Sequence, residues 1–125
     1  MSARTAIVLA ALFAAAPLAH AQKYPERPIR MVVPFAPGGG TDIIGRIVGQ
    51  GLGETLGQPV VIDNRGGAGS TLGTEIVAKS PSDGYTLLFG NISLAFNVTL
   101  YTKLRYDTRR DLTPVTLAAV QPNIV

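Results

Sequence analysis

Two glycine-rich stretches are the residues of this chain best suited to chemistry. The first, PFAPGGGTD, runs from Pro34 to Asp42 between an apolar segment and a polar pair that can open a helix. The second, NRGGAGST, occupies residues 64–71. A helix N-terminus offers unpaired backbone N–H groups and about half a positive charge, and glycine lets a ligand approach that backbone closely. Both stretches therefore predict anion binding.

The spacing of the glycines argues against nucleotide phosphates. The dinucleotide pattern G-x-G-x-x-G would begin at Gly38 and fails at Ile43, and in the second stretch it fails at Leu72. A phosphate loop laid over residues 40–47 has Arg46 where the motif needs lysine and no hydroxyl after it. We therefore expect an anion other than a nucleotide.

Catalytic residues do not form a complete set in this sequence. The only histidine is His20, there is no cysteine, and neither a G-x-S-x-G motif nor carboxylates with metal-ligand spacing occur. Asp42 and Asp63 could approach one another as an acid/base pair, but such a pair needs a perturbed environment that a sequence does not reveal. We predict no catalytic residues, no metal site and no cofactor.

Apolar segments and amphipathic segments alternate around these stretches. Residues 29–35 and 59–63 are short, apolar runs that predict buried strands, and residues 85–89 predict a third strand. Residues 41–56 repeat apolar side chains every four positions, which predicts a helix, and residues 70–80 form a weaker amphipathic helix with Ser70 as N-cap. The order predicts an α/β fold, a parallel βαβαβ sheet with crossover helices.

In such a sheet, ligands bind beyond the carboxyl ends of the strands, where both glycine stretches and Asn91 are expected. Gly57 is in place to end the first helix. Within that helix Gly45, Gly49 and Gly53 share one face, which predicts close packing on a sheet or a second helix. A membrane pair of small residues is disfavoured because charged residues lie in the same segment.

The other segments carry simpler expectations. Gly66, Gly67 and Gly69 are expected to serve the tight turn into the second helix rather than a ligand, and Tyr85 and Phe89 are expected in the core. Residues 93–101 can form a short helix, residues 103–111 read as a polar loop, and residues 112–120 predict another strand.

The first 21 residues predict a cleavable signal peptide. An apolar run from Ala6 to Leu18 precedes Ala19-His20-Ala21, which has the small-x-small form that signal peptidase requires, so we expect mature protein from Gln22. A transmembrane anchor is the alternative, but the run is shorter than the about 20 residues that span a bilayer. Export without cysteine fits a bacterial periplasm and a fold held by its hydrophobic core.

Charge gives no indication of a nucleic-acid partner. The chain has a net charge of +3, which falls to +2 when the leader with Arg4 is removed, and the basic residues are scattered apart from 105–110. The last residues, VTLAAVQPNIV, are apolar up to Val125, so we expect the chain to be the N-terminal part of a longer protein.

Three blocks of the sequence resemble one family. YPERPIRMVVPFAPGGGTD, LGQPVVIDNRGGAGSTLGTEIVAKSPSDGYTLLFG and YDTRRDLTPVTLAA are similar, in order, to the exported solute-binding proteins of tripartite tricarboxylate transporters, the Bug receptors. The resemblance implies a two-lobed periplasmic-binding-protein (flytrap) fold that closes on a small carboxylate and delivers it to membrane permease subunits. It further implies that residues 22–125 are the incomplete N-terminal part of domain 1, that the second lobe is absent from this chain, and that the receptor is a monomer and not an enzyme.

The resemblance also implies where the ligand binds. The loop after the first strand and the end of the third strand supply the candidate ligand-binding residues Phe35, Ala36, Gly39, Gly40, Thr41, Asp42, Asn91 and Ser93. Backbone N–H groups and a hydroxyl suit a carboxylate, whereas the charge of Asp42 would repel one and better fits a role in orienting the loop. Arg65 either offsets ligand charge or pairs with Asp63 or a surface partner.

Two other functions, and the case of a product without function, stay open from the sequence alone. The same receptor fold could serve a signalling partner such as a sensor kinase instead of a permease. A truncated product with half a cleft would have no function. A secreted α/β enzyme is the least favoured, because it rests only on the generic architecture of glycine loops.

Overall fold

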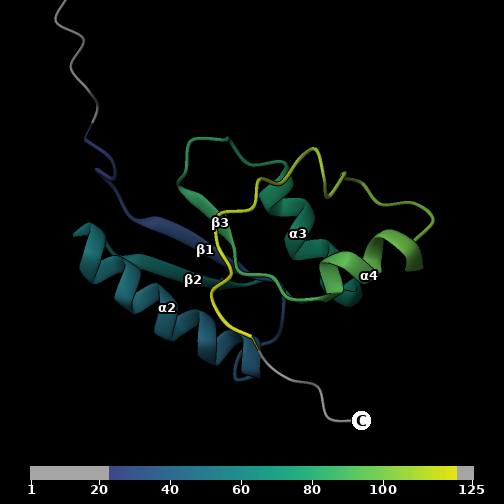
Figure 1. Cartoon of the computed structure of the whole chain (residues 1–125), viewed down its shortest axis with the longest axis horizontal. Helices are drawn as coiled ribbons and strands as arrows, with labels where there is room; N and C mark the ends of the chain where they lie inside the picture. Colours follow the sequence, from purple (N-terminus) through teal and green to yellow (C-terminus); the bar gives the residue numbers. More distant parts are fainter. Residues whose placement is uncertain (1–22, 121–125) are drawn as a thin grey trace, which may run out of the picture.

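The computed structural model describes residues 23–120, so the predicted signal peptide and its cleavage site lie outside the described residues. Its elements are β1 (Ile29–Val33), α2 (Gly40–Leu56), β2 (Val60–Asn64), a 3-10 turn (Ala68–Ser70), α3 (Thr71–Ala78), β3 (Thr86–Leu88) and α4 (Ser93–Leu100) (Figure 1). The predicted order of strands and helices is confirmed from the first strand to the short helix after β3.

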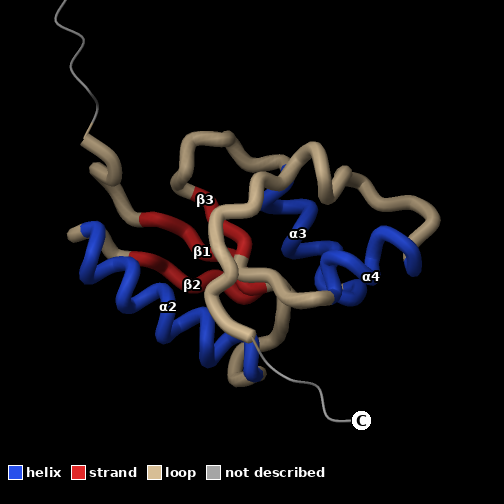
Figure 2. The backbone as a smooth tube through the Cα atoms, viewed as in Figure 1, coloured by secondary structure: helices blue, strands red, loops and turns tan. Residues whose placement is uncertain are grey.

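The three strands form one parallel sheet in the order β2-β1-β3. Ile29 pairs with Val60 and Val33 with Asn64, and on the other side Arg30 pairs with Thr86. The sheet lies between α2 on one side and α3 on the other (Figure 2). Because all strands run in the same direction, their carboxyl ends meet at one edge of the sheet, which confirms the predicted α/β fold.

The core is centred on β1, the middle strand, whose apolar side chains are buried. The prediction that the second strand is also buried is wrong, because Val61 on β2 is 53 % exposed. β2 is an edge strand, and its side chains alternate between the face that α2 covers and the opposite face.

Helix α2 lies close to the sheet because of its glycines. A Cβ built on Gly45 would lie 3.2 Å from Phe89 Cδ1, and one on Gly49 would lie 3.0 Å from Ile62 Cδ1. The predicted packing of the glycine face on a sheet is confirmed. The helix ends as predicted at Gly57, which adopts the left-handed conformation (φ 68°) and donates its N–H to the Gly53 carbonyl.

The predicted strand at residues 112–120 is wrong. No residue of this segment joins the sheet, and Val115, Leu117 and Val120 are about four-fifths exposed. A strand is stabilised by hydrogen bonds to a neighbouring strand, and neither edge of the described sheet provides one for this segment. Apolar composition alone therefore misidentified it.

The two aromatic side chains expected in the core at the third strand, Tyr85 and Phe89, are both half-buried. Phe89 lies against α2, where a Cβ on Gly45 would be 3.2 Å from its Cδ1. Tyr85 contacts the segment that precedes β1. Its ring centroid lies 5.1 Å from that of Tyr24, and the Arg27 guanidinium lies 4.1 Å from the centroid of the Tyr85 ring. Within residues 23–120, no helix combines the length and apolar character needed to cross a bilayer.

Candidate functional site

The N-terminus of α2 presents unpaired backbone donors at the carboxyl edge of the sheet. Gly39 is the N-cap residue and provides no side-chain cap, and the first helical hydrogen bond runs from the Ile43 N–H to the Gly39 carbonyl at 3.0 Å. The N–H groups of residues 40–42 therefore precede the helical ladder, and no acceptor in the described part of the chain pairs with them. Such a set of donors can bind an anion.

The glycines beside these donors face open space. A Cβ on Gly40 would meet no atom within 4 Å, and one on Gly39 would meet only the Ala36 carbonyl oxygen at 3.7 Å. Gly39 has φ −76°, which any residue can adopt, whereas Gly38 has φ 83° and needs glycine for conformational reasons. Packing within the described residues therefore does not account for glycine at positions 39 and 40.

Asp42 is the buried anchor of this loop. Its side chain accepts hydrogen bonds from the Gly38 N–H (2.8 Å), Arg46 Nε (3.0 Å) and Asn64 Nδ2 (2.9 Å). These hydrogen bonds lower the pKa of Asp42 to about 2, and the one from Arg46 has the largest effect, followed by those from Gly38 and Asn64. The carboxylate thus orients the loop, as the sequence favoured, while direct contact with a ligand stays a prediction.

Acid is expected to weaken this anchor. The pKa of Asp42 is about 2 against an ordinary value of 3.8, so the unfolded state takes up a proton more readily than the folded state. The stabilisation is present above about pH 4 and is lost as the pH falls through about 2. Melting temperatures measured between pH 7 and pH 2 should therefore fall more steeply for the native chain than for Asp42→Asn, and parallel curves would contradict the assignment.

The end of the third strand meets the first glycine stretch. Asn91 Nδ2 donates to Thr41 Oγ1 at 3.3 Å, and Asn91 Oδ1 accepts the Ser93 N–H at 2.9 Å. Two candidate residues from distant segments are thus brought together, Thr41 at the start of α2 and the exposed Asn91. The side chain of Ser93 instead lies 2.8 Å from the hydroxyl of Ser70, towards the second stretch.

Phe35 and Ala36 contribute backbone to the same edge. Phe35 is half-buried and its carbonyl accepts a hydrogen bond from Asn64 at 3.2 Å, whereas Ala36 is exposed. The second glycine stretch packs directly behind them, since a Cβ on Gly66 would lie 3.3 Å from the Ala36 nitrogen. The first loop is therefore supported from behind by the second.

The second stretch serves the turn into α3, as expected. Gly67 and Gly69 have φ values of 134° and 61°. Ser70 occupies the predicted N-cap position of α3, but its hydroxyl makes no cap hydrogen bond and instead accepts one from Asn97 Nδ2 at 3.0 Å. Asn97 is buried and also donates to the Gly69 carbonyl at 2.8 Å. The Ser70 hydroxyl is therefore bonded to the Asn97 amide and not to the N–H groups at the start of α3.

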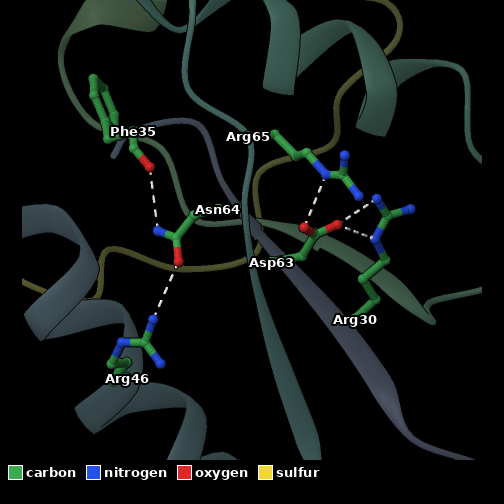
Figure 3. Close-up of polar contacts among 6 residues, drawn as sticks. All are labelled: Arg30, Phe35, Arg46, Asp63, Asn64 and Arg65. Atoms are coloured by element: carbon green, nitrogen blue, oxygen red, sulfur yellow. Dashed lines mark hydrogen bonds and ion pairs between the residues drawn. The ribbon is translucent and has the colours of Figure 1, made fainter. Parts of the chain in front are cut away.

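Arg65 pairs with Asp63, one of the alternatives left open by the sequence. Its Nε donates to Asp63 Oδ1 at 2.8 Å, and Arg30 Nε donates to the other oxygen at 2.8 Å (Figure 3). Asp63 and Asn64 are neighbours on β2 and so point to opposite faces of the sheet. Asp42 and Asp63 are therefore held by different partners and do not form an acid/base pair.

Sequence reasoning did not identify three polar residues whose side chains build this edge: Arg46, Asn64 and Asn97. It also did not predict the hydrogen bonds that Ser70 makes with Ser93 and Asn97. The signal for Asn64 was available, because it ends the strand segment VVIDN at the edge where ligand-binding residues gather. Within residues 23–120, no group of three metal-ligating side chains is placed to hold a metal ion.

Comparisons with known proteins agree on one family. Residues 44–125, more than half of the chain, match the model of the tripartite tricarboxylate transporter family receptor. Protein BugT of Bordetella pertussis is 45 % identical over 121 residues, which cover 95 % of this chain and 37 % of BugT. A relative from Pseudomonas sp. strain P51 is 45 % identical over 82 % of this chain and 30 % of its own length, so the chain spans about a third of these relatives.

Solved structures with the same fold include two with organic acids. MatC from Rhodopseudomonas palustris with bound malate is 42 % identical with a TM-score of 0.67, over 74 % of this chain and 32 % of MatC. R. palustris Rpa4515 with adipate is 39 % identical with a TM-score of 0.65, over 69 % and 29 % of the two chains. The parallel sheet thus matches part of each of these solved chains, and the chain belongs to the non-enzymatic receptor family of the tripartite tricarboxylate transporters.

Proposed function

We propose that this chain contributes half of the binding site of a periplasmic receptor that captures a small carboxylate and delivers it to the permease subunits of a tripartite tricarboxylate transporter. The observation that carries the proposal is the set of unpaired N–H groups at residues 40–42, beside glycines that face open space. The organic acids bound to MatC and Rpa4515 support the class of ligand.

In this proposal the carboxylate lies at the start of α2. The N–H groups of Gly40 and Thr41 donate to its oxygens, and the helix dipole favours its negative charge. Thr41 Oγ1 is within reach of Asn91, so a ligand there would touch the ends of the first and third strands together. Phe35, Ala36, Gly39, Asp42 and Ser93 complete the candidate set around this point.

The proposal extends to the organisation of the whole receptor. Residues 1–21 would direct export and be removed after Ala21, and residues 22–125 would form part of domain 1, with a second lobe closing over the ligand. The working receptor would be a monomer that meets the permease in its closed state. The unpaired N–H groups at one edge of a single lobe support this arrangement, because a carboxylate bound there would be contacted from one side and would leave its other side for a second lobe.

The test is a thermal-shift screen of the complete receptor, stripped of endogenous ligand, against mono-, di- and tricarboxylates that include malate and adipate. A ligand at a hundred times its dissociation constant stabilises a protein by about 2.7 kcal/mol, which gives a clear rise in melting temperature. The uncharged amides of the same acids, with every carboxyl group converted, serve as controls and should give no shift. If no acid in the panel raises the melting temperature, the proposed ligand class is wrong.

A further inference from the structure

We infer that Asn64 is a positioning residue that fixes the two ends of the first glycine loop, residues 35–42, and thereby sets the direction of the N–H groups at the start of α2. The inference deepens the proposed function and rests on it only for the consequence in ligand binding. Asn64 was not among the residues expected to take part in the site.

The side-chain amide of Asn64 makes three contacts that join three segments. Its Nδ2 donates to the Phe35 carbonyl at 3.2 Å and to Asp42 Oδ1 at 2.9 Å. Its Oδ1 accepts a hydrogen bond from Arg46 Nη2 at 3.1 Å. Figure 3 shows Asn64 between the Phe35 carbonyl and the Arg46 guanidinium. A single residue of β2 thus contacts both ends of the loop and the first turns of α2.

The contact with Asp42 extends the restraint into the loop itself. Asp42 Oδ2 accepts the N–H of Gly38 at 2.8 Å, and Gly38 has the left-handed conformation that turns the chain towards α2. Residues 36–40 are exposed, and Cβ positions at Gly38 and Gly40 meet no neighbour. Apart from the packing of Gly66 against Ala36, few contacts restrain these residues, so the conformation of residues 37–40 depends on the hydrogen bonds through Asp42 and Asn64.

Asparagine suits this position because the site needs both donors and an acceptor. The two protons of Nδ2 match two oxygen acceptors, and Oδ1 matches a guanidinium. Aspartate has the same shape but would face the Phe35 carbonyl and the Asp42 carboxylate with oxygen atoms only. It would also add a negative charge beside Asp42, whose charge Arg46 balances at 3.0 Å, and so oppose an anion at the helix start.

Amide hydrogen exchange in the ligand-free, complete receptor tests the restraint directly. In Asn64→Asp the Gly38 amide is expected to exchange at least about tenfold faster than in the native protein, while amides in the second half of α2 keep their rates. Gln50→Glu is the matched control: it makes the same amide-to-acid change on the exposed side of α2, where Gln50 bonds only Glu54, and should leave the loop unchanged.

A second variant keeps the test decisive if Asn64→Asp fails to fold. Asp42→Asn keeps the size of the side chain but replaces one carboxylate oxygen with an NH2 donor, which faces either Asn64 Nδ2 or the Gly38 N–H, so it too should accelerate exchange at Gly38. The inference is overturned if Asn64→Asp, or Asp42→Asn where Asn64→Asp does not fold, shows native exchange rates in residues 36–42.

A separate experiment measures the affinity of the native receptor and of the variants for malate and adipate. If the native receptor binds either acid, Asn64→Asp should weaken that affinity at least about tenfold and Gln50→Glu should not. Native affinity in Asn64→Asp would refute positioning for the ligand. If the native receptor binds neither acid, those ligands are wrong for the proposed function, and the exchange measurement still decides whether Asn64 restrains the loop.

Discussion

Replacing Gly40 with aspartate is expected to weaken carboxylate binding at least about a hundredfold while the fold stays intact. Two unit charges about 4 Å apart repel by about 4 kcal/mol at the effective dielectric constant of a protein surface, which exceeds the about 1.4 kcal/mol that changes an affinity tenfold. The new side chain has room, since a Cβ at this position meets nothing within 4 Å. An acidic residue in the first turn also favours the helix by about 0.3–1 kcal/mol.

Calorimetric titration with the acid found in the thermal-shift screen measures this loss, and urea unfolding measures stability. Gly40→Asn is the matched control, because it has the same size without the charge and should lose less affinity. Gly40→Asp is expected to lower the affinity for the acid and to raise the free energy of unfolding. A loss of affinity without a loss of stability separates an effect on the ligand from an effect on folding. Native affinity in Gly40→Asp would remove the start of α2 from the binding site.

The second large effect is expected at Gly73, where α3 packs on the carboxyl end of β1. A Cβ there would lie 2.6 Å from the Arg65 carbonyl oxygen and 2.8 and 2.9 Å from Pro34 Cβ and Cα. Two of these neighbours are backbone atoms and the third belongs to the proline ring, so none can rotate away as a flexible side chain would. Gly73→Ala is therefore expected to destabilise the protein by about 3 kcal/mol, the upper end of the usual cost of overpacking.

Gly51→Ala is the matched control for that prediction. Gly51 is an exposed residue within α2, and a Cβ at this position meets nothing within 4 Å. Alanine should therefore stabilise the helix by about 0.5–1 kcal/mol, because glycine in a helix interior costs that much. Urea unfolding of both variants gives the comparison, and a destabilisation of equal size in both would contradict the contacts described for Gly73.

Much of the architecture was determined by the sequence itself. The repeat of apolar residues in 41–56 and the β-branched run before Pro34 specify α2 and β1, since both patterns act over neighbouring residues. Pro34 has no N–H to donate, which agrees with the end of β1 at Val33. The four-residue spacing of Gly45, Gly49 and Gly53 likewise predicted one close-packed face, because helical periodicity alone places them together.

Tertiary structure alone decided how the edge of the sheet is built. Asn64 reaches Phe35 and Asp42, which are 29 and 22 residues away, only after β2 has paired with β1 in its observed register. The exposed face of β2 and the unpaired segment 112–120 also depend on which neighbours cover a strand. Local patterns report the preferences of a segment, whereas hydrogen-bond partners and burial arise from contacts between segments far apart in the chain.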